Sequence, residues 1–450
     1  MKKTFFFMTL CLSFFNHATT LDKQQLRQLL KIAKEKSPLY RDAELKIREA
    51  TLQKEISFGN FLPKINLTAQ NTYGDGTNSD TRNGRDGQFW NHNLTASLEE
   101  NFFDGGSHYY QHKIKEYYRQ ESLLDATLTL EDLSYRVAEE YYGYLLSIKG
   151  YEIKAQKHKT LLDQFDTIRA AYLQGLKTSD DYMRFEAKVM RSKIDVASSL
   201  KQIKKNKMDL CLTLGVGPNN ENLKEFHFEK AANNLSQINL PQLIEQKEKF
   251  LKDVLNNHPL LEKQKIAENI AHISTTITSL DLFPRLSIQS SLNYQLPNYP
   301  SKMGDFGSKK EGNYDWQTMF TVSFNIFDFG ERRKKVEIAH IQELKQNALH
   351  HKEKLELENN IKKTTLDIEE QIEEFKISKK LLMLEEKNYK QIEKSYRNSK
   401  AAYLDMIEAL QNYASAQEGV FQISYELKKS QFNMLKNQRK LYDYLQQDEK

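Results

Sequence analysis

The sequence predicts a mixed α and β membrane protein that contains two internal repeats. Three observations support this prediction. Short residue clusters recur in the same order in both halves of the chain, four short segments alternate apolar and polar side chains, and two long segments lack proline. Alternation with a period of two is typical of strands, whereas long proline-free segments rich in Lys, Glu and Leu are typical of helices.

The composition favours long, wet helices over a compact enzyme. The chain has 450 residues, of which 28% are charged, and it contains only 17 Gly and 8 Pro. Few helix breakers and many charges are compatible with long helices that face water. The formal net charge is only +5, with acids and bases interleaved. This balance argues against a nucleic-acid partner, which would require a strongly basic surface.

Residues 1–20 have the features of a secretory signal peptide. Lys2 and Lys3 precede an apolar run over 4–15, and small and polar residues follow that run. The run is too short to cross a bilayer as a helix, so we exclude residues 1–20 from the fold and expect export. A buried soluble strand is the less favoured alternative. The mature chain then keeps one cysteine, Cys211, which cannot form an internal disulfide.

An internal duplication organises the rest of the chain. We expect a first repeat over 21–220, a connector over 221–257 and a second repeat over 258–450. Each repeat is expected to contain a helix, two strands and a long helical hairpin. The matching clusters are Ser37-Pro38-Leu39 with His258-Pro259-Leu260, Phe61-Leu62-Pro63-Lys64 with Leu282-Phe283-Pro284-Arg285, and Phe102-Phe103-Asp104-Gly105-Gly106 with Ile326-Phe327-Asp328-Phe329-Gly330.

Four strands are predicted, over about 64–73, 89–103, 285–295 and 315–327. One face of each strand is apolar and ends in Trp, Tyr or Phe, and the other face carries Asn, Gln, Ser and Thr. About ten residues suffice for a tilted strand to cross a bilayer, and this alternation is typical of outer-membrane barrels. Two soluble hairpins packed on helices are the alternative.

The number of strands predicts an assembly. Four strands cannot close a membrane barrel, because the smallest known barrels use about eight. Open strand edges are not tolerated in lipid, so several protomers must share one barrel. Three protomers would supply about twelve strands and enclose a usable pore. The sequence therefore favours a trimeric 12-stranded outer-membrane β-barrel with four strands per protomer.

Long helical hairpins are predicted over 107–214 and 331–446. Neither segment contains proline, and the plausible breaks lie near Gly175 and Ser399. At about 1.5 Å per residue we expect each helix to run roughly 100 Å, far longer than a globular core. Helices of that length must pack sideways as coiled coils.

The order of these motifs resembles the TolC family of outer-membrane channels, over residues 21–445. The segments Phe61-Leu62-Pro63-Lys64-Ile65 and Leu282-Phe283-Pro284-Arg285-Leu286 resemble the family's entry to the first strand of each pair. The two Asp-Gly clusters resemble its junction between strand and helix. Two further segments resemble the first hairpin tip and the stretch that follows the second tip, namely Tyr172 to Gly175 and Tyr403-Leu404-Asp405-Met406-Ile407-Glu408-Ala409.

The resemblance implies a homotrimer whose barrel, in contact with outer-membrane lipid, continues as a long periplasmic α-helical barrel. Residues 221–257 would then belong to its equatorial region. It also implies a passive channel-tunnel of a tripartite efflux pump or a type I secretion system. Such a channel docks on a periplasmic adaptor (a membrane fusion protein) and an inner-membrane transporter. No catalysis, no cofactor and no nucleic-acid partner are expected. A secreted coiled-coil structural or adhesive protein without a pore is the alternative.

The resemblance also points to a pore constriction. Asp405 and Glu408 lie three residues apart, so they share one helix face. In a threefold assembly they would form two stacked rings of carboxylates, which favour cations and repel anions. Ordinary solvated acids on a helix face are the alternative.

Two further sets of residues lie at the predicted tips. Tyr396 matches a residue that helps to hold the closed state in the family, and Lys400 stands beside the position where a basic residue is expected. We expect the second set to contact the adaptor, with plain loop residues as the alternative. This set consists of Tyr172, Gly175, Leu176, Lys177, Thr178, Ser399 and Ala401.

Catalytic or metal-binding motifs are weak. His108, His112 and Glu116 are spaced by four residues on a helix and could hold zinc, but an exposed helix face is the favoured interpretation. The sequence contains no phosphate-binding glycine loop with a following Lys, no HExxH and no nucleophile elbow. An enzyme is therefore not expected.

Overall fold

The computed structural model describes residues 23–77, 86–217, 226, 228–236, 238, 258–296, 313–398 and 400–446. The predicted signal peptide lies outside these residues, and so does most of the predicted connector. The chain divides into two compact units. We call residues 46–123 with 263–351 the strand unit, and the remaining residues the helical unit.

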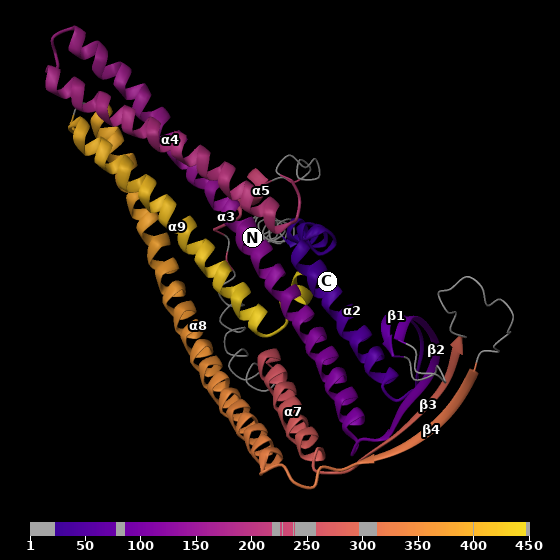
Figure 1. Ribbon diagram of the computed structural model, residues 1–450. Coiled ribbons are helices and arrows are strands. Elements are labelled where there is room, and N and C mark those ends of the chain that lie inside the picture. The colour runs from indigo at the N-terminus through magenta and orange to yellow at the C-terminus, as the bar shows by residue number, and fades with distance from the viewer. Residues whose placement is uncertain are drawn as a thin grey trace, which may run out of the picture. The chain divides into compact units, whose positions relative to one another are not determined.

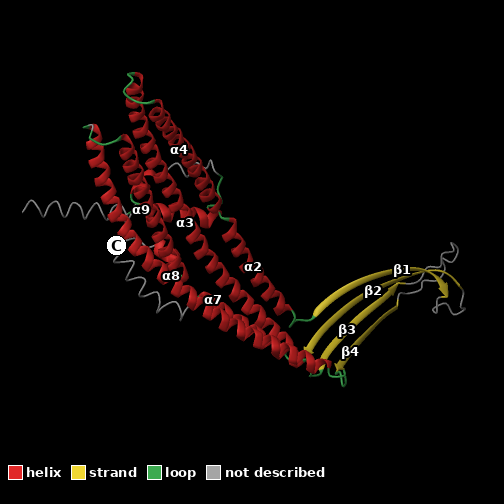
Figure 2. Cartoon of the chain, turned by 90° about the vertical axis from the view of Figure 1, so that its left-hand side faces the viewer, coloured by secondary structure: helices red, strands yellow, loops and turns green. Residues whose placement is uncertain are grey.

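The strand unit contains a four-stranded antiparallel sheet (Figure 2). Its strands lie side by side in the order β1 (Lys64–Thr77), β2 (Asp86–Phe103), β3 (Arg285–Leu296) and β4 (Asn313–Ser323). The structure thus confirms four strands per chain, with the two hairpins joined through β2 and β3.

The strand ends differ from the predicted ends. β1 and β2 extend further into their hairpin, where Thr77 still pairs with Asp86. β4 stops at Ser323, not at 327, although the alternation continues. Ser323 pairs with Arg285, the first residue of β3, so the residues after it have no partner strand there. Strand length is set by the partner as well as by the pattern.

Residues directly opposite one another in the sheet share a face, so the register sets the chemistry of each face. Rows run across all four strands. One row is apolar and consists of Leu67, Ala96, Leu292 and Trp316. The adjacent row is polar and consists of Thr68, Thr95, Asn293 and Asp315. One face of the sheet is therefore mainly apolar, with polar exceptions such as Ser290 and Thr318, and its large side chains are exposed in the single chain; the other face is mainly polar.

Each repeat carries one long and one short helix of the hairpin. α3 (Ser107–Leu173) and α8 (Glu331–Arg397) have 67 residues each, whereas α4 (Ser179–Thr213) and α9 (Tyr403–Asn437) have 35. At about 1.5 Å per residue these lengths are roughly 100 Å and 50 Å. The expectation of 100 Å for every helix is wrong for α4 and α9, because the tips divide each hairpin unequally.

The second hairpin also ends before the predicted residue 446. α9 ends at Asn437, and a separate α10 (Leu441–Gln446) follows. Arg439 between them has a positive φ of 58°, which turns the chain out of the helix. The other helices are α2 (Pro38–Gly59), α5 (Phe228–Asn233) and α7 (Pro259–Leu280). Within the described ranges, none of the helices combines the length and apolarity needed to cross a bilayer.

The repeated Asp-Gly cluster begins each long helix in the strand unit. Asp104 accepts hydrogen bonds from the backbone N–H groups of Gly106 (3.0 Å) and His108 (2.7 Å). Asp328 repeats the arrangement with Gly330 (3.1 Å) and Arg332 (3.2 Å). The carboxylates thus satisfy N–H groups that the first turn of a helix leaves unpaired.

In the helical unit, α3 and α9 lie between α4 and α8 (Figures 1 and 2). One apolar cluster joins α8 to α9, through residues such as Ile368, Phe375 and Leu427. Another joins α3 and α4 to α9, through residues such as Phe185 and Ile407. The helices α4 and α8 are consequently the two outer helices of this unit.

Candidate functional site at the helical tips

The first tip forms because the chain turns sharply at Gly175, which has a φ of +73°. The N–H of Leu176 donates to the carbonyl of Ala171 (2.9 Å) and that of Gly175 to Tyr172 (2.9 Å). This is a Schellman ending, in which glycine adopts the left-handed conformation without steric cost. α4 begins soon after, with Thr178 accepting a hydrogen bond from the N–H of Asp181 (3.1 Å).

The surface of this tip mixes apolar and polar groups. Leu176 is largely exposed, as is Leu173, which the sequence analysis did not select. Lys177 and Thr178 are also exposed. The ring of Tyr172 stacks on Tyr182, with the centroids 5.0 Å apart. The tip is therefore a hydrogen-bonded turn with two exposed leucines.

The second tip is described on both sides of Ser399, which itself lies outside the described residues. The N–H of Lys400 donates to the carbonyl of Ser395 (2.8 Å), and the Lys400 side chain is exposed. Ala401 and Tyr396 are half-buried. Burial raises the pKa of the Tyr396 hydroxyl.

The two predicted constriction residues lie on the exposed side of α9. Asp405 and Glu408 are both exposed, while Met406 and Ile407 between them are buried. Asp405 also accepts a hydrogen bond from the N–H of Ala402 (3.3 Å) and so satisfies a donor at the start of α9. Asp405 therefore has a structural contact of its own at the start of α9.

The two hairpins are bound to each other at their tips by Tyr403. Its hydroxyl donates to the carboxylate of Asp181 at 3.0 Å. The ammonium group of Lys177 lies 5.3 Å from the centroid of the Tyr403 ring, a cation–π distance. The hydrogen bond from Tyr403 is the largest cause of the lowered pKa of Asp181. Burial, followed by the Asp181 contact, raises the pKa of Tyr403.

Sequence reasoning missed this connection between the hairpins. The sequence analysis includes Tyr403 only as the first residue of a segment after the second tip, and it does not select Asp181. The two residues lie 222 positions apart, so no local pattern links them. The one available signal was that both stand immediately after a predicted tip.

The candidate zinc residues do not converge. His108 is bonded to Asp104, and Nδ1 of His112 lies 2.8 Å from the hydroxyl of Ser57. Glu116 instead binds Arg119 and Lys54, and the hydrogen bond from Arg119 is the largest cause of its lowered pKa. Among the described residues, no group of three His, Cys, Asp or Glu side chains could hold a metal ion.

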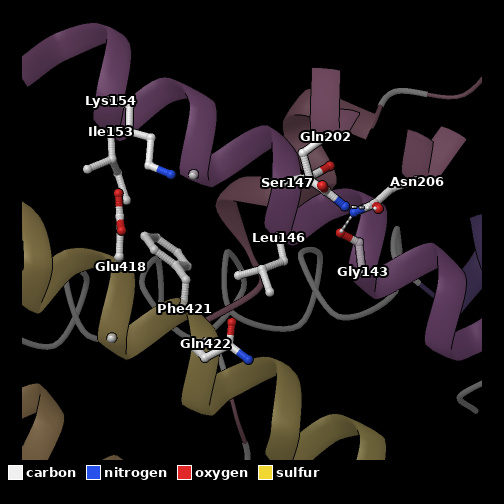
Figure 3. A pocket seen from close by; sticks show the side chains of 12 residues that line it. Gly143, Leu146, Ser147, Ile153, Lys154, Gln202, Asn206, Glu418, Phe421 and Gln422 are labelled. Carbon is white, nitrogen blue, oxygen red and sulfur yellow. Dashed lines mark hydrogen bonds between the residues drawn. The ribbon is translucent and has the colours of Figure 1, made fainter. Parts of the chain in front are cut away.

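A cavity of about 490 Å³ lies in the helical unit between α3, α4 and α9 (Figure 3). The amide of Asn206 donates to the carbonyl of Gly143 at its wall (3.0 Å). Ile153 of α3 and Glu418 of α9 also line it. The cavity therefore marks a loosely packed stretch of the contact between α3 and α9.

Comparisons with known proteins identify the family of this chain and structures with a similar fold. The chain matches the family of outer membrane efflux proteins over residues 29–216 and 250–436. No curated protein matches it. Several solved structures share its fold at low identity. They include the MtrE outer membrane channel of Neisseria gonorrhoeae (17% identity, TM-score 0.69, 93% of this chain and 88% of that one). The CmeC outer membrane channel of Campylobacter jejuni (13%, 0.73, 92% and 85%) and the outer membrane protein VceC of Vibrio cholerae (14%, 0.70, 92% and 96%) are also similar.

The sequence resemblance to the TolC family is confirmed, because the family match covers most of both repeats. Membership also confirms that the chain is not an enzyme. The chain belongs to the outer membrane efflux protein family, as an outer-membrane channel protein with a periplasmic helical domain.

Proposed function

We propose that three copies of this chain form one 12-stranded outer-membrane barrel that continues as a periplasmic helical tunnel. The observation that carries the proposal is the sheet itself, which has an apolar face, a polar face and two edge strands, β1 and β4. Because lipid offers no hydrogen bonds to a free edge, β1 of one copy must pair with β4 of the next. Two copies would close only about eight strands and leave little lumen.

The proposed role is a passive conduit of a tripartite efflux pump. The family match supports efflux. The hairpin tips would dock on a periplasmic adaptor, which connects the conduit to an inner-membrane transporter. Leu173, Leu176 and Lys177 offer apolar and cationic contacts at the first tip, and Ala401 with the residues around it at the second. A type I secretion system is the second candidate, because the same tunnel could pass polypeptides.

The constriction is proposed at α9. Asp405 and Glu408 are exposed on that helix, and threefold repetition would stack two rings of carboxylates. The bond between Tyr403 and Asp181 supports a second element of the closed state, because it fixes α9 to α4 within one copy. Tyr396 and Lys400 are proposed to act at the same tip, between copies.

Single-channel conductance in a planar lipid bilayer tests the channel and the gate together. The variant Asp405→Asn with Glu408→Gln removes both charges and leaves an acceptor for the N–H of Ala402. The control Asp195→Asn with Glu356→Gln removes two exposed acids from other helices. A small conductance, blocked by divalent cations and released only in the first variant, supports the proposal.

The other outcomes are equally informative. A pore that is indifferent to divalent cations and to both variants would keep the channel and discard the acidic gate. A purified chain that stays monomeric and never inserts into the bilayer contradicts the channel itself.

A further inference from the structure

The glycines of the hairpin helices gather around one cavity. The helices α3, α4, α8 and α9 contain three glycines, which are Gly143, Gly150 and Gly419. All three line the cavity of about 490 Å³ in the helical unit (Figure 3). Glycine is among the least favourable residues inside a helix, because it loses more backbone freedom on folding than any other residue. Three such residues at one place therefore require an explanation.

Close packing between the helices does not explain these glycines. A Cβ at Gly150 or at Gly419 would meet no atom within 4 Å, and a Cβ at Gly143 would touch the ring of Tyr425 at an ordinary 3.9 Å. Alanine would therefore fit at each of the three positions. What the glycines preserve is the open volume beside them, which lies in the range of about 300–1,000 Å³ that small-molecule pockets occupy.

The walls of the cavity change in character along its length (Figure 3). Lys154 of α3 and Glu418 of α9 lie at one end, and they are the charged residues of the lining. Leu146 and the ring of Phe421 form an apolar stretch in the middle. At the other end the Asn206 amide lies against α3, where it donates to a backbone carbonyl at 3.0 Å. A ligand of this cavity would therefore meet charges, an apolar surface and a carboxamide in turn.

The charged end of the cavity holds an ammonium group and a carboxylate that are not bonded to each other. Lys154 and Glu418 are both half-buried. Neither an ion pair nor a hydrogen bond joins these two described residues, although both side chains line the same cavity. A charge that is partly withdrawn from water is stabilised by a partner of opposite sign. The cavity therefore offers an acceptor for a cation and a donor for an anion at the same end.

We propose that the cavity binds a small amphipathic zwitterion, a molecule that carries an ammonium group, a carboxylate and an apolar body. The ammonium group of the ligand binds Glu418, and its carboxylate binds Lys154. The apolar body lies along Leu146 and the ring of Phe421, and a polar group at its far end reaches Asn206. The glycines leave the volume that this ligand fills.

Charge complementarity selects the zwitterion over simpler ions. A ligand with only an ammonium group would meet Lys154 as well as Glu418, and a ligand with only a carboxylate would meet Glu418 as well as Lys154. Like charges repel, so each singly charged ligand loses part of what it gains. Every lining residue belongs to the helical unit of one chain, so the site exists whether or not copies assemble into a channel.

A fluorescence titration tests the proposal on the whole chain in lipid nanodiscs. The probe is Nε-dansyl-lysine, a zwitterion whose dansyl group becomes brighter in apolar surroundings. Dansylcadaverine and dansylglycine carry the same fluorophore, the first with only a cation and the second with only an anion. After the signal from empty nanodiscs is subtracted, we expect saturable binding of dansyl-lysine. The other two probes should bind about tenfold more weakly, because each lacks one charge-assisted hydrogen bond.

Two sets of variants assign the binding to this cavity. Glu418→Gln and Lys154→Gln should each weaken the binding of dansyl-lysine by about tenfold. Lys159→Gln, which removes a charge from an exposed position of α3, should leave it unchanged. Gly150→Leu should abolish saturable binding, because its side chain fills the cavity. Gly150→Ala adds one methyl group, for which there is room, and should keep the binding.

Thermal melting distinguishes a filled cavity from a damaged fold. Both Gly150 variants replace glycine by a better helix former, so their melting temperatures should equal or exceed that of the wild type. Loss of binding in Gly150→Leu at an undiminished melting temperature supports the site. The site is overturned by an absence of saturable binding, by equal binding of the three probes, or by dansyl-lysine binding that survives Gly150→Leu and Glu418→Gln unchanged. A chain that binds dansyl-lysine as expected but gives no conductance contradicts the proposed channel and not this site.

Discussion

Replacing Gly215 by alanine should be among the most destabilising single changes in the helical unit. Gly215 ends α4 with a φ of +69°, and the N–H of Val216 donates to the carbonyl of Cys211 (3.0 Å). A Cβ at this position would lie 2.4 Å from the carbonyl oxygen of Lys36 and 2.9 Å from Cα of Ser37. These are backbone atoms, which cannot rotate away.

The magnitude follows from two costs. A left-handed conformation costs a residue with a Cβ about 1–2 kcal/mol, and overpacking against a rigid neighbour costs about 1–3 kcal/mol. Gly215→Ala should therefore lower the free energy of unfolding by about 2–5 kcal/mol. Gly217→Ala is the control, because a Cβ there meets no atom within 4 Å. Urea unfolding followed by helical circular dichroism measures both, and equal stabilities for the two variants would refute the reasoning.

Three other predictions follow. Arg439→Gly should stabilise the chain by about 0.5–1 kcal/mol, since it relieves a positive φ of 58° and loses a partly exposed ion pair with Glu262; a lower melting temperature would contradict this. Tyr403→Phe removes the bond to Asp181 and should increase the open probability of single channels, whereas Tyr182→Phe keeps the ring stacking at the same tip, breaks no hydrogen bond found among the described residues and serves as its control. Burial raises the pKa of Glu131 to about 7 while Leu441 and Tyr442 donate to it at the start of α10. A pKa raised from the ordinary 4.5 to about 7 contributes stability that is fully present below pH 4.5 and is lost as pH rises to 7, so the melting temperature should fall between about pH 4.5 and 7 in the wild type and less in Glu131→Gln.

The sequence alone was sufficient to predict structural features that repeat with a short period or that depend on a single residue. The alternation of apolar and polar residues identified all four strands. In the rows described above, apolar residues lie opposite apolar residues of the neighbouring strand, and polar residues lie opposite polar ones. Gly175 marked the first tip because a left-handed turn favours glycine. These features are local, so their physical cause lies within a few residues of the signal.

Features that depend on distant partners were not predictable. The end of β4 is set by the start of β3, which lies on another strand of the same hairpin. The connection between Tyr403 and Asp181 requires two hairpins to be placed side by side, and nothing near either residue encodes that placement. The role of Asp405 as a hydrogen-bond acceptor for Ala402 likewise appeared only with the backbone of the tip.

The duplicated hairpins also differ in the ion pairs that they can form. Inside one chain, Lys429 pairs with Glu139 and Lys436 with Asp132, and both pairs join α3 to α9. The equivalent positions, 224 residues away, hold Lys205 with Lys363 and Leu212 with Glu356, so neither ion pair could form between those residues. The ion pairs between α3 and α9 should therefore help to hold the two hairpins of one copy together, beside the bond of Tyr403 with Asp181.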